Sequence, residues 1–172
     1  MSEHPYDVRT DPKMLEALRR IAPGTNMRQG INDILRGDLG ALIVIGEPAE
    51  LSFLFSGGIR LDQSFSPYLL YELAKMDGAI ILNAMATRIV YANVQLMPDP
   101  TIPSAETGTR HRTAERVAKQ TGALVISISQ QRDVVTTYVG DVRYQLEDIS
   151  DILAKTNQAV TTLETYRTRF EQ

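Results

Sequence analysis

The order of apolar and polar residues along the chain predicts helices interspersed with strands. Two continuous apolar runs, 41–46 (ALIVIG) and 123–129 (ALVISIS), are typical of strands buried on both faces. Shorter apolar or alternating runs predict further strands over 50–58, 79–84, 88–97 and 134–140. Periodic apolar positions predict helices within 11–24, 25–40, 66–78, about 111–121 and about 146–170.

Capping residues sharpen several of these boundaries. Asp11 followed by Pro12, and Ser66 followed by Pro67, are typical of helix starts, and Gly122 is typical of a helix end. The stretch 98–108 contains three prolines and has no apolar period, so it is predicted to be a loop.

The alternation of the two element types predicts an α/β fold, with a mixed central β-sheet flanked by helices. A length of 172 residues suits one such domain, which we expect over 11–145. Residues 1–10 are predicted to be a flexible tail. Residues 146–172 are predicted to form a long C-terminal helix, which either docks on the sheet or begins a linker.

Composition narrows the chemistry. The chain has no cysteine and two histidines, which excludes thiolate zinc sites and disfavours a histidine metal cluster, so a bound metal would be Mg²⁺ or Mn²⁺ held by oxygens. The net charge of −3 gives no global basis for nucleic-acid binding. No apolar run reaches the ~18 residues of a membrane span, so we expect no membrane partner and a cytoplasmic protein.

Arg110, His111 and Arg112 form a basic turn at the start of the helix predicted over about 111–121. The positive end of the helix dipole disfavours cations there by ~0.3–1 kcal/mol each. One interpretation is a solvated turn paired with Glu106 or Glu115. The other is an anion site, in which free backbone N–H groups and arginine forks bind a phosphate.

Two further positions are candidates for the same site. Asp77 lies between a predicted helix and strand, where its carboxylate either projects from the sheet or simply belongs to an Asp-Gly turn. Ser127 and Ser129 share one face of a predicted strand, and either Ser129 meets a ligand at the strand end or both serines face a packed helix or another subunit. Walker A, GxGxxG and GxSxG motifs are absent from the sequence, so the familiar phosphate loops and a serine hydrolase elbow are disfavoured.

The motifs DGAIILN (77–83) and SAETGTRHRTAERVAKQTGALVISIS (104–129) resemble those of the diadenylate cyclase family, most closely its DNA-integrity-scanning (DisA) branch. The likeness extends over roughly 10–150. It implies condensation of two ATP molecules into cyclic di-AMP, with release of two pyrophosphates and a requirement for Mg²⁺ or Mn²⁺.

The resemblance also implies roles for individual residues. Asp77 would bind the metal and help to deprotonate the ribose 3′-hydroxyl, and Gly78 would let the backbone approach the nucleotide. The residues that would hold phosphates are Thr109, Arg110, His111, Arg112 and Ser129, with Arg132 as an additional phosphate contact. Leu96 would lie against the adenine, and Thr113 would also line the site.

A ring product made of two identical halves suits two subunits that face each other across a two-fold axis. The resemblance accordingly implies a homo-oligomer, at least a face-to-face dimer and in this branch an octamer. It implies DNA contact only through a C-terminal region that this chain lacks. Two other functions stay open: a catalytically silent module that binds ATP or cyclic di-AMP, and a structural oligomerisation domain whose arginines pair with a neighbouring subunit.

Overall fold

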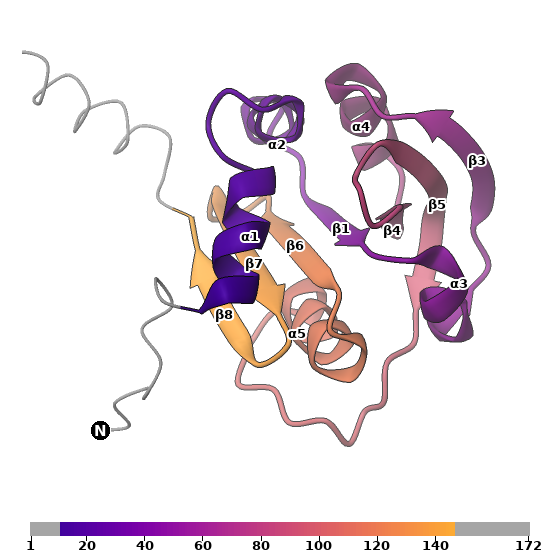
Figure 1. Cartoon of the computed structure of the whole chain (residues 1–172), viewed down its shortest axis with the longest axis vertical. Helices are drawn as coiled ribbons and strands as arrows, with labels where there is room; N and C mark the ends of the chain where they lie inside the picture. The colour runs from indigo at the N-terminus through magenta and orange to yellow at the C-terminus, as the bar shows by residue number, and fades with distance from the viewer. Residues whose placement is uncertain (1–10, 147–172) are drawn as a thin grey trace, which may run out of the picture.

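The computed structural model describes residues 11–146, which form one mixed sheet with helices on both faces (Figure 1). The strands follow the order β2-β5-β4-β1-β6-β7-β8, and β3 also pairs with β5. The pair β1–β4 is parallel and every other pairing is antiparallel. The strands are β1 (Ala41–Ile45), β2 (Phe55–Ser56), β3 (Ile59–Ser64), β4 (Ala79–Leu82), β5 (Arg88–Leu96), β6 (Leu124–Ser129), β7 (Val134–Val139) and β8 (Val142–Gln145).

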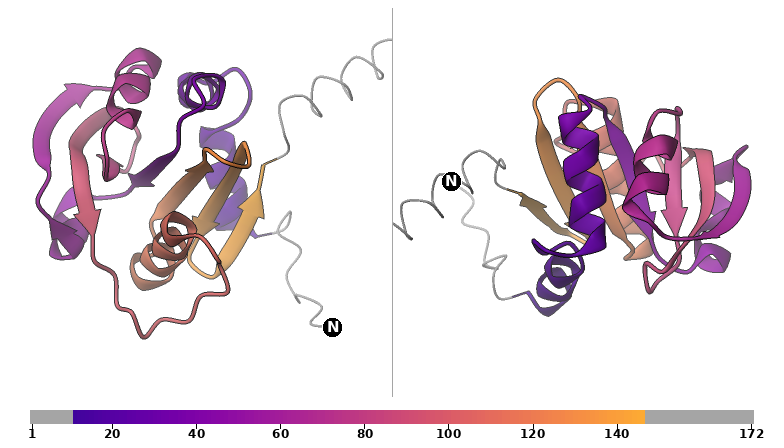
Figure 2. Two further views of the ribbon diagram at one scale, coloured as in Figure 1. Left: turned by 180° about the vertical axis from the view of Figure 1, so that it is seen from behind. Right: turned by 90° about the horizontal axis from the view of Figure 1, so that it is seen from above.

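Helices cover the two faces unequally. One face carries α1 (Pro12–Arg20), α2 (Asn26–Arg36) and α4 (Pro67–Ala74), and the other carries α3 (Pro48–Leu51), the short 3₁₀ turn η1 (Ser52–Leu54) and α5 (Thr109–Thr121). Figures 1 and 2 show α1 and α5 on opposite sides of β6 and β7. The predicted fold class is therefore confirmed.

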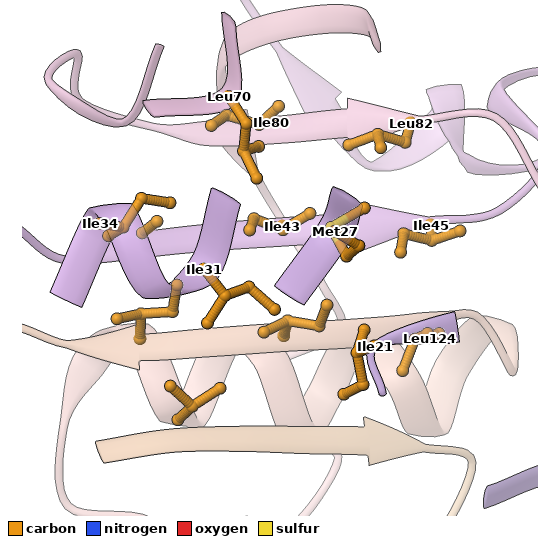
Figure 3. Packing of buried hydrophobic residues seen from close by; sticks show 14 of the residues in the cluster. Ile21, Met27, Ile31, Ile34, Ile43, Ile45, Leu70, Ile80, Leu82 and Leu124 are labelled. Atoms are coloured by element: carbon orange, nitrogen blue, oxygen red, sulfur yellow. The ribbon is translucent and has the colours of Figure 1, made fainter. Parts of the chain in front are cut away.

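Each face of the sheet has its own apolar core. Side chains of α2, among them Met27 and Ile31, lie over Ile43 and Ile45 of β1 (Figure 3). Strand β6 contributes to both cores because its side chains alternate, with Ile126 on the α1–α2–α4 side and Val125 on the α5 side. Burying each such side chain stabilises the fold by about 1.5–3 kcal/mol.

The predicted caps are present. The Asp11 carboxylate accepts a hydrogen bond from the Met14 N–H (2.9 Å), and the Ser66 hydroxyl accepts one from the Leu69 N–H (3.1 Å). Helix α5 ends at Gly122, which has a φ of 76°. Such a left-handed residue is favoured at a helix end, where its N–H bonds back to a carbonyl of the last turn.

The strand predicted over 50–58 is wrong. Pro48 begins a helical turn, so Leu51 and Leu54, three residues apart, are buried while Phe53 is 67% exposed. Only Phe55–Ser56 of that stretch is strand. Alternation at 51, 53 and 55 was therefore misleading.

Strands β3 and β8 were not predicted. Most side chains of β3 are exposed and β8 is only half-buried, so neither strand has a clear apolar signal. Helix α5 also begins at Thr109, two residues before the predicted start. Among the described residues, no helix combines the length and apolarity that a bilayer span requires. The predicted tail over 1–10, and the long helix expected from about 146, fall outside the described residues.

Candidate functional site

A cavity of about 590 Å³ opens at the edge of the sheet where β1 and β4 begin and β5 and β6 end. Ligands in open α/β sheets usually bind at the carboxyl ends of strands, which here applies to β5 and β6 but not to the parallel pair. The predicted site residues that line this cavity are Asp77, Gly78, Leu96, Thr109, Arg110, His111, Thr113 and Ser129. The fold therefore brings together residues that lie more than fifty positions apart.

Asp77 enters the cavity from the connection between α4 and β4, as predicted, and is exposed. Gly78 follows with a φ of 87°, a backbone conformation that favours glycine. A Cβ at Gly78 would lie 2.8 Å from the carbonyl carbon of Asn93, at the irregular part of the β4–β5 pairing. Close packing against β5 therefore accounts for this glycine, whereas its approach to a nucleotide stays a prediction.

The amino end of α5 has unpaired donors. Gly108 precedes the helix, and no side chain caps this end. The first backbone N–H to bond within the helix belongs to Arg112, which donates to the Gly108 carbonyl (2.9 Å). The N–H groups of Thr109, Arg110 and His111 consequently have no acceptor within the helix and, with the dipole, favour an anion.

Arg110 is anchored at one nitrogen and open at the others. Its Nη1 donates to the carbonyl of Ile128 at the end of β6 (3.0 Å), and the residue as a whole is exposed. The guanidinium also lies over Gly40, where an added Cβ would overlap it. Gly40, which sequence reasoning missed, therefore creates the space that Arg110 occupies beside β1.

His111 packs inward. Its Nδ1 lies 3.2 Å from the hydroxyl of Ser127, which is fully buried on β6. Burial lowers the pKa of His111 below its ordinary value of 6.5, which favours the neutral ring at pH 7. Ser127 thus faces a packed helix, as one of the two interpretations expected, and Ser129 lines the cavity.

The pairing of the basic turn with Glu106 or Glu115 is not what the structure contains. Glu106 accepts hydrogen bonds from Nε of Arg143 (2.6 Å) and from the Tyr138 hydroxyl (3.0 Å). Burial opposes ionisation of Glu106, but these bonds outweigh it and lower its pKa. Glu115 pairs with Lys119 (3.5 Å). Both carboxylates are therefore engaged with other cations.

Two predicted phosphate contacts do not line the cavity in a single chain. Arg112 follows His111 on α5 and is half-buried, and Arg132 is exposed in the turn between β6 and β7. Sequence reasoning missed other lining residues, among them Met76, Gln95, Gln130 and Gln131. Gln130 and Gln131 directly follow Ser129, so their place after a strand end was the signal that could have found them.

A comparison with protein families decides the identity of this fold. The DAC family, described as "DisA bacterial checkpoint controller nucleotide-binding", matches residues 28–142, which is more than half of the chain. The chain belongs to the DAC family. The resemblance that the two motifs suggested is thereby confirmed. The DAC match includes the whole cavity lining, from Leu39 to Gln131.

Curated relatives agree with the DAC assignment. The DNA integrity scanning protein DisA of Carboxydothermus hydrogenoformans is 57% identical over 91% of this chain and 45% of its own length. The protein of the same name from Symbiobacterium thermophilum is 58% identical over 88% of this chain and 43% of its own length. The chain therefore spans less than half of the length of these relatives.

Solved structures share the architecture. The crystal structure of a double-mutant form of DacA from Staphylococcus aureus is 25% identical, covers 78% of this chain and 91% of its own, and superposes with a TM-score of 0.59. A hypothetical membrane spanning protein from Bacillus cereus is 24% identical, covers 71% of this chain and 62% of its own, and has a TM-score of 0.62. The second likeness concerns the fold alone.

Proposed function

We propose that this DAC domain is a diadenylate cyclase, which condenses two ATP molecules into cyclic di-AMP and releases two pyrophosphates. The observation that carries the proposal is the meeting of an exposed carboxylate, Asp77, with an uncapped helix end bearing Arg110 in one cavity. A simple anion site would need the helix end but not the carboxylate. A transfer between nucleotides needs both.

Phosphate binding is assigned to the amino end of α5. The free N–H groups of Thr109, Arg110 and His111 and the exposed guanidinium nitrogens of Arg110 supply donors for phosphate oxygens. Ser129 adds a hydroxyl from the end of β6, and Arg112 stays a predicted contact. Nucleotidyl transfer depends mainly on alignment and charge stabilisation, and in this proposal these donors supply both.

The residues present fit a divalent cation that arrives with the nucleotide. Of the described residues that line the cavity, one is a carboxylate, and no cluster of three or more acidic or histidine ligands occurs among residues 11–146. Mg²⁺ is commonly held by one or two carboxylates together with substrate phosphates, and Mn²⁺ suits the same oxygen donors. When bound, such an ion would neutralise phosphate charge and lower the pKa of a coordinated hydroxyl.

Asp77 is assigned the ribose end of the reaction. Its carboxylate would bind the ion and help to accept the proton of the 3′-hydroxyl that attacks the α-phosphorus of the second ATP. Each attack forms one P–O bond and breaks the bond to pyrophosphate, so two attacks close the ring. Leu96 and Thr113, which line the same cavity, are assigned to the nucleoside.

Two copies of the chain are required in this proposal. Each 3′-hydroxyl attacks the other nucleotide, so two ATP molecules must face each other in opposite directions. Two cavities related by a two-fold axis satisfy this requirement, and the cavity is open to the surface. A face-to-face dimer is therefore the smallest active assembly that we propose, with an octamer as the larger form, in a cytoplasmic setting.

The proposal is tested by incubating the protein with ATP and Mn²⁺ and analysing the products by mass spectrometry. We expect cyclic di-AMP together with two equivalents of pyrophosphate. Binding of ATP without any product, in a protein that assembles into oligomers, would instead identify a silent nucleotide-binding module. If ATP is neither bound nor converted, the remaining function is the structural oligomerisation role.

A further inference from the structure

The loop that joins β5 to α5 connects two walls of the cavity, because it starts beside Leu96 and ends at Gly108. Figures 1 and 2 show it as a long excursion between these two elements. Side chains of α5 hold its middle: Nε of Arg116 donates to the Ile102 carbonyl (2.9 Å), and Nζ of Lys119 donates to the Pro103 carbonyl (3.0 Å). The middle of the loop is thus fixed along the helix.

The second half of the loop is held by Glu106, three residues before α5 begins at Thr109. One oxygen of its carboxylate accepts hydrogen bonds from the Tyr138 hydroxyl on β7 (3.0 Å) and from Nε of Arg143 on β8 (2.6 Å). Tyr138 is 1% exposed and the Glu106 side chain is 17% exposed, so the bond between them lies largely out of solvent, whereas the Arg143 side chain is 44% exposed. Charge-assisted bonds of this kind are shorter and stronger than neutral ones.

We propose that Glu106 is a positioning residue, which holds the amino end of α5 against β7 and β8 so that Arg110 and His111 face the nucleotide. The inference rests on the proposed function. Three separate strands hold the residues on either side of Gly108: β7 and β8 through Glu106, and β6 through the bonds of Arg110 and His111. Of these three residues, Arg110 and His111 line the cavity and Glu106 does not.

Glu106 also has an electrostatic link to the basic turn. The charged groups that face His111 are Glu106 from the loop, Arg110 on α5, Arg143 on β8 and Arg132 in the β6–β7 turn. Glu106 raises the pKa of His111, whereas the three arginines lower it. Removing the carboxylate charge should therefore lower the pKa of His111 further, which reports whether Glu106 stays beside the turn in solution.

The kinetic test replaces Glu106 in the assembled protein. We expect Glu106→Ala to raise KM for ATP about tenfold, since misplaced binding groups weaken both binding and alignment. Glu106→Gln keeps an acceptor for Tyr138 and should recover part of the loss. The matched control is Glu115→Gln, because Glu115 is similarly shielded on α5 and pairs with Lys119 away from the cavity. A merely structural role would reduce the active fraction and leave KM unchanged, which would overturn the proposal.

A double-mutant cycle tests whether Glu106 acts through Arg143. If it does, Arg143→Ala added to Glu106→Ala should raise KM by less than about twofold beyond the single variant, because contacting residues are not additive. Full additivity of the two changes in KM would contradict a shared role.

A second readout is independent of catalysis. The chain has two histidines, so the His111 resonance can be assigned with a His4→Gln variant and titrated by NMR without nucleotide. We expect a lower His111 pKa in Glu106→Gln than in the wild type, and no change in Glu115→Gln. An unchanged His111 pKa would overturn the positioning role. Absence of cyclic di-AMP from the wild type, with the pKa shift present, would instead count against the proposed function alone.

Discussion

Two cavities of similar size lie at opposite ends of the sheet and differ in the chemistry of their walls. The candidate site encloses about 590 Å³ beside the amino end of α5, and a second cavity of about 540 Å³ lies beside its carboxyl end. The second cavity opens where β1 ends, between α1 and α3. In α/β sheets this is the more usual place for a ligand.

The second cavity is lined by side chains of both charges. Its lining includes Lys13 and Arg20, but also Glu16, Glu47 and Glu50, and Arg20 pairs with Glu16 (3.5 Å) and donates to the Ala84 carbonyl. There α5 ends at Gly122, whose N–H bonds to the Ala118 carbonyl (2.8 Å).

The candidate site has the opposite character. Donors of an uncapped helix end and an incompletely used guanidinium face a single carboxylate among the described lining residues. Cavity volume therefore says little about function, whereas unpaired donors at one end of α5 favour a phosphate there.

Removing the carboxylate of the candidate site should have the largest effect. We expect Asp77→Asn to lower cyclic di-AMP formation by at least about a hundredfold, since it removes an oxygen ligand and a proton acceptor. ATP affinity, measured by calorimetry, should be largely kept. Glu47→Gln, the matched change in the second cavity, should leave the rate of product formation unchanged.

Removing the cation of the candidate site should weaken binding. Arg110→Ala should raise the Kd for ATP by about 10- to 100-fold, because hydrogen bonds to charged groups contribute about 1.5–3 kcal/mol. Arg20→Ala, in the second cavity, should leave the Kd for ATP within about twofold of the wild-type value. A change of that size is well below the energy of one hydrogen bond to a charged group. Equal losses of ATP affinity in Arg110→Ala and Arg20→Ala would mean that ATP prefers neither cavity.

The glycine beneath Arg110 should matter without touching ATP. In Gly40→Ala the new Cβ would overlap the guanidinium and displace it from the Ile128 carbonyl. We expect a three- to tenfold higher Kd for ATP, about the size of a modest overpacking penalty. In Gly46→Ala, the new Cβ would lie 3.1 Å from Leu51 in the second cavity, and the Kd should not change.

The smallest expected effect concerns pH. The folded state resists protonation of His111, while the unfolded chain protonates it near the ordinary value of 6.5. Stability should therefore fall as pH drops below about 6.5, because the unfolded state then binds more protons. Urea denaturation at pH 7.5 and 5.5 should show a smaller fall for His111→Gln. Glu106 contributes its own loss only as pH falls below its ordinary 4.5, outside this window.

Much of the fold could be predicted from the sequence because its central strands are continuous apolar runs. Strands β1 and β6 are buried along nearly their whole length, and Asp11 and Ser66 start their helices by local hydrogen bonds. The peripheral strands β3 and β8 could not be predicted, since pairing with β5 and β7 forms them rather than an apolar pattern of their own.

The candidate site likewise contains residues that the sequence could predict and residues that it could not. Asp77 and the basic turn have local signals, a helix–strand junction and cations at the wrong end of a helix. Gly40 has no such signal, and the sequence pointed to Glu106 only as a partner of the basic turn. Their observed roles depend on Arg110 for Gly40, and on Tyr138 and Arg143 for Glu106, which lie 32 and 37 residues from it along the chain. Tertiary contacts of this kind are not visible in a single sequence.

The most direct test of the central claim is an NMR titration of histidine-labelled protein with 3′-deoxy-ATP and Mg²⁺, since this nucleotide lacks the attacking hydroxyl. We predict a saturable shift of the His111 resonance with the same Kd that calorimetry gives. Saturable binding by calorimetry with an unmoved His111 resonance would place the nucleotide elsewhere and contradict the account.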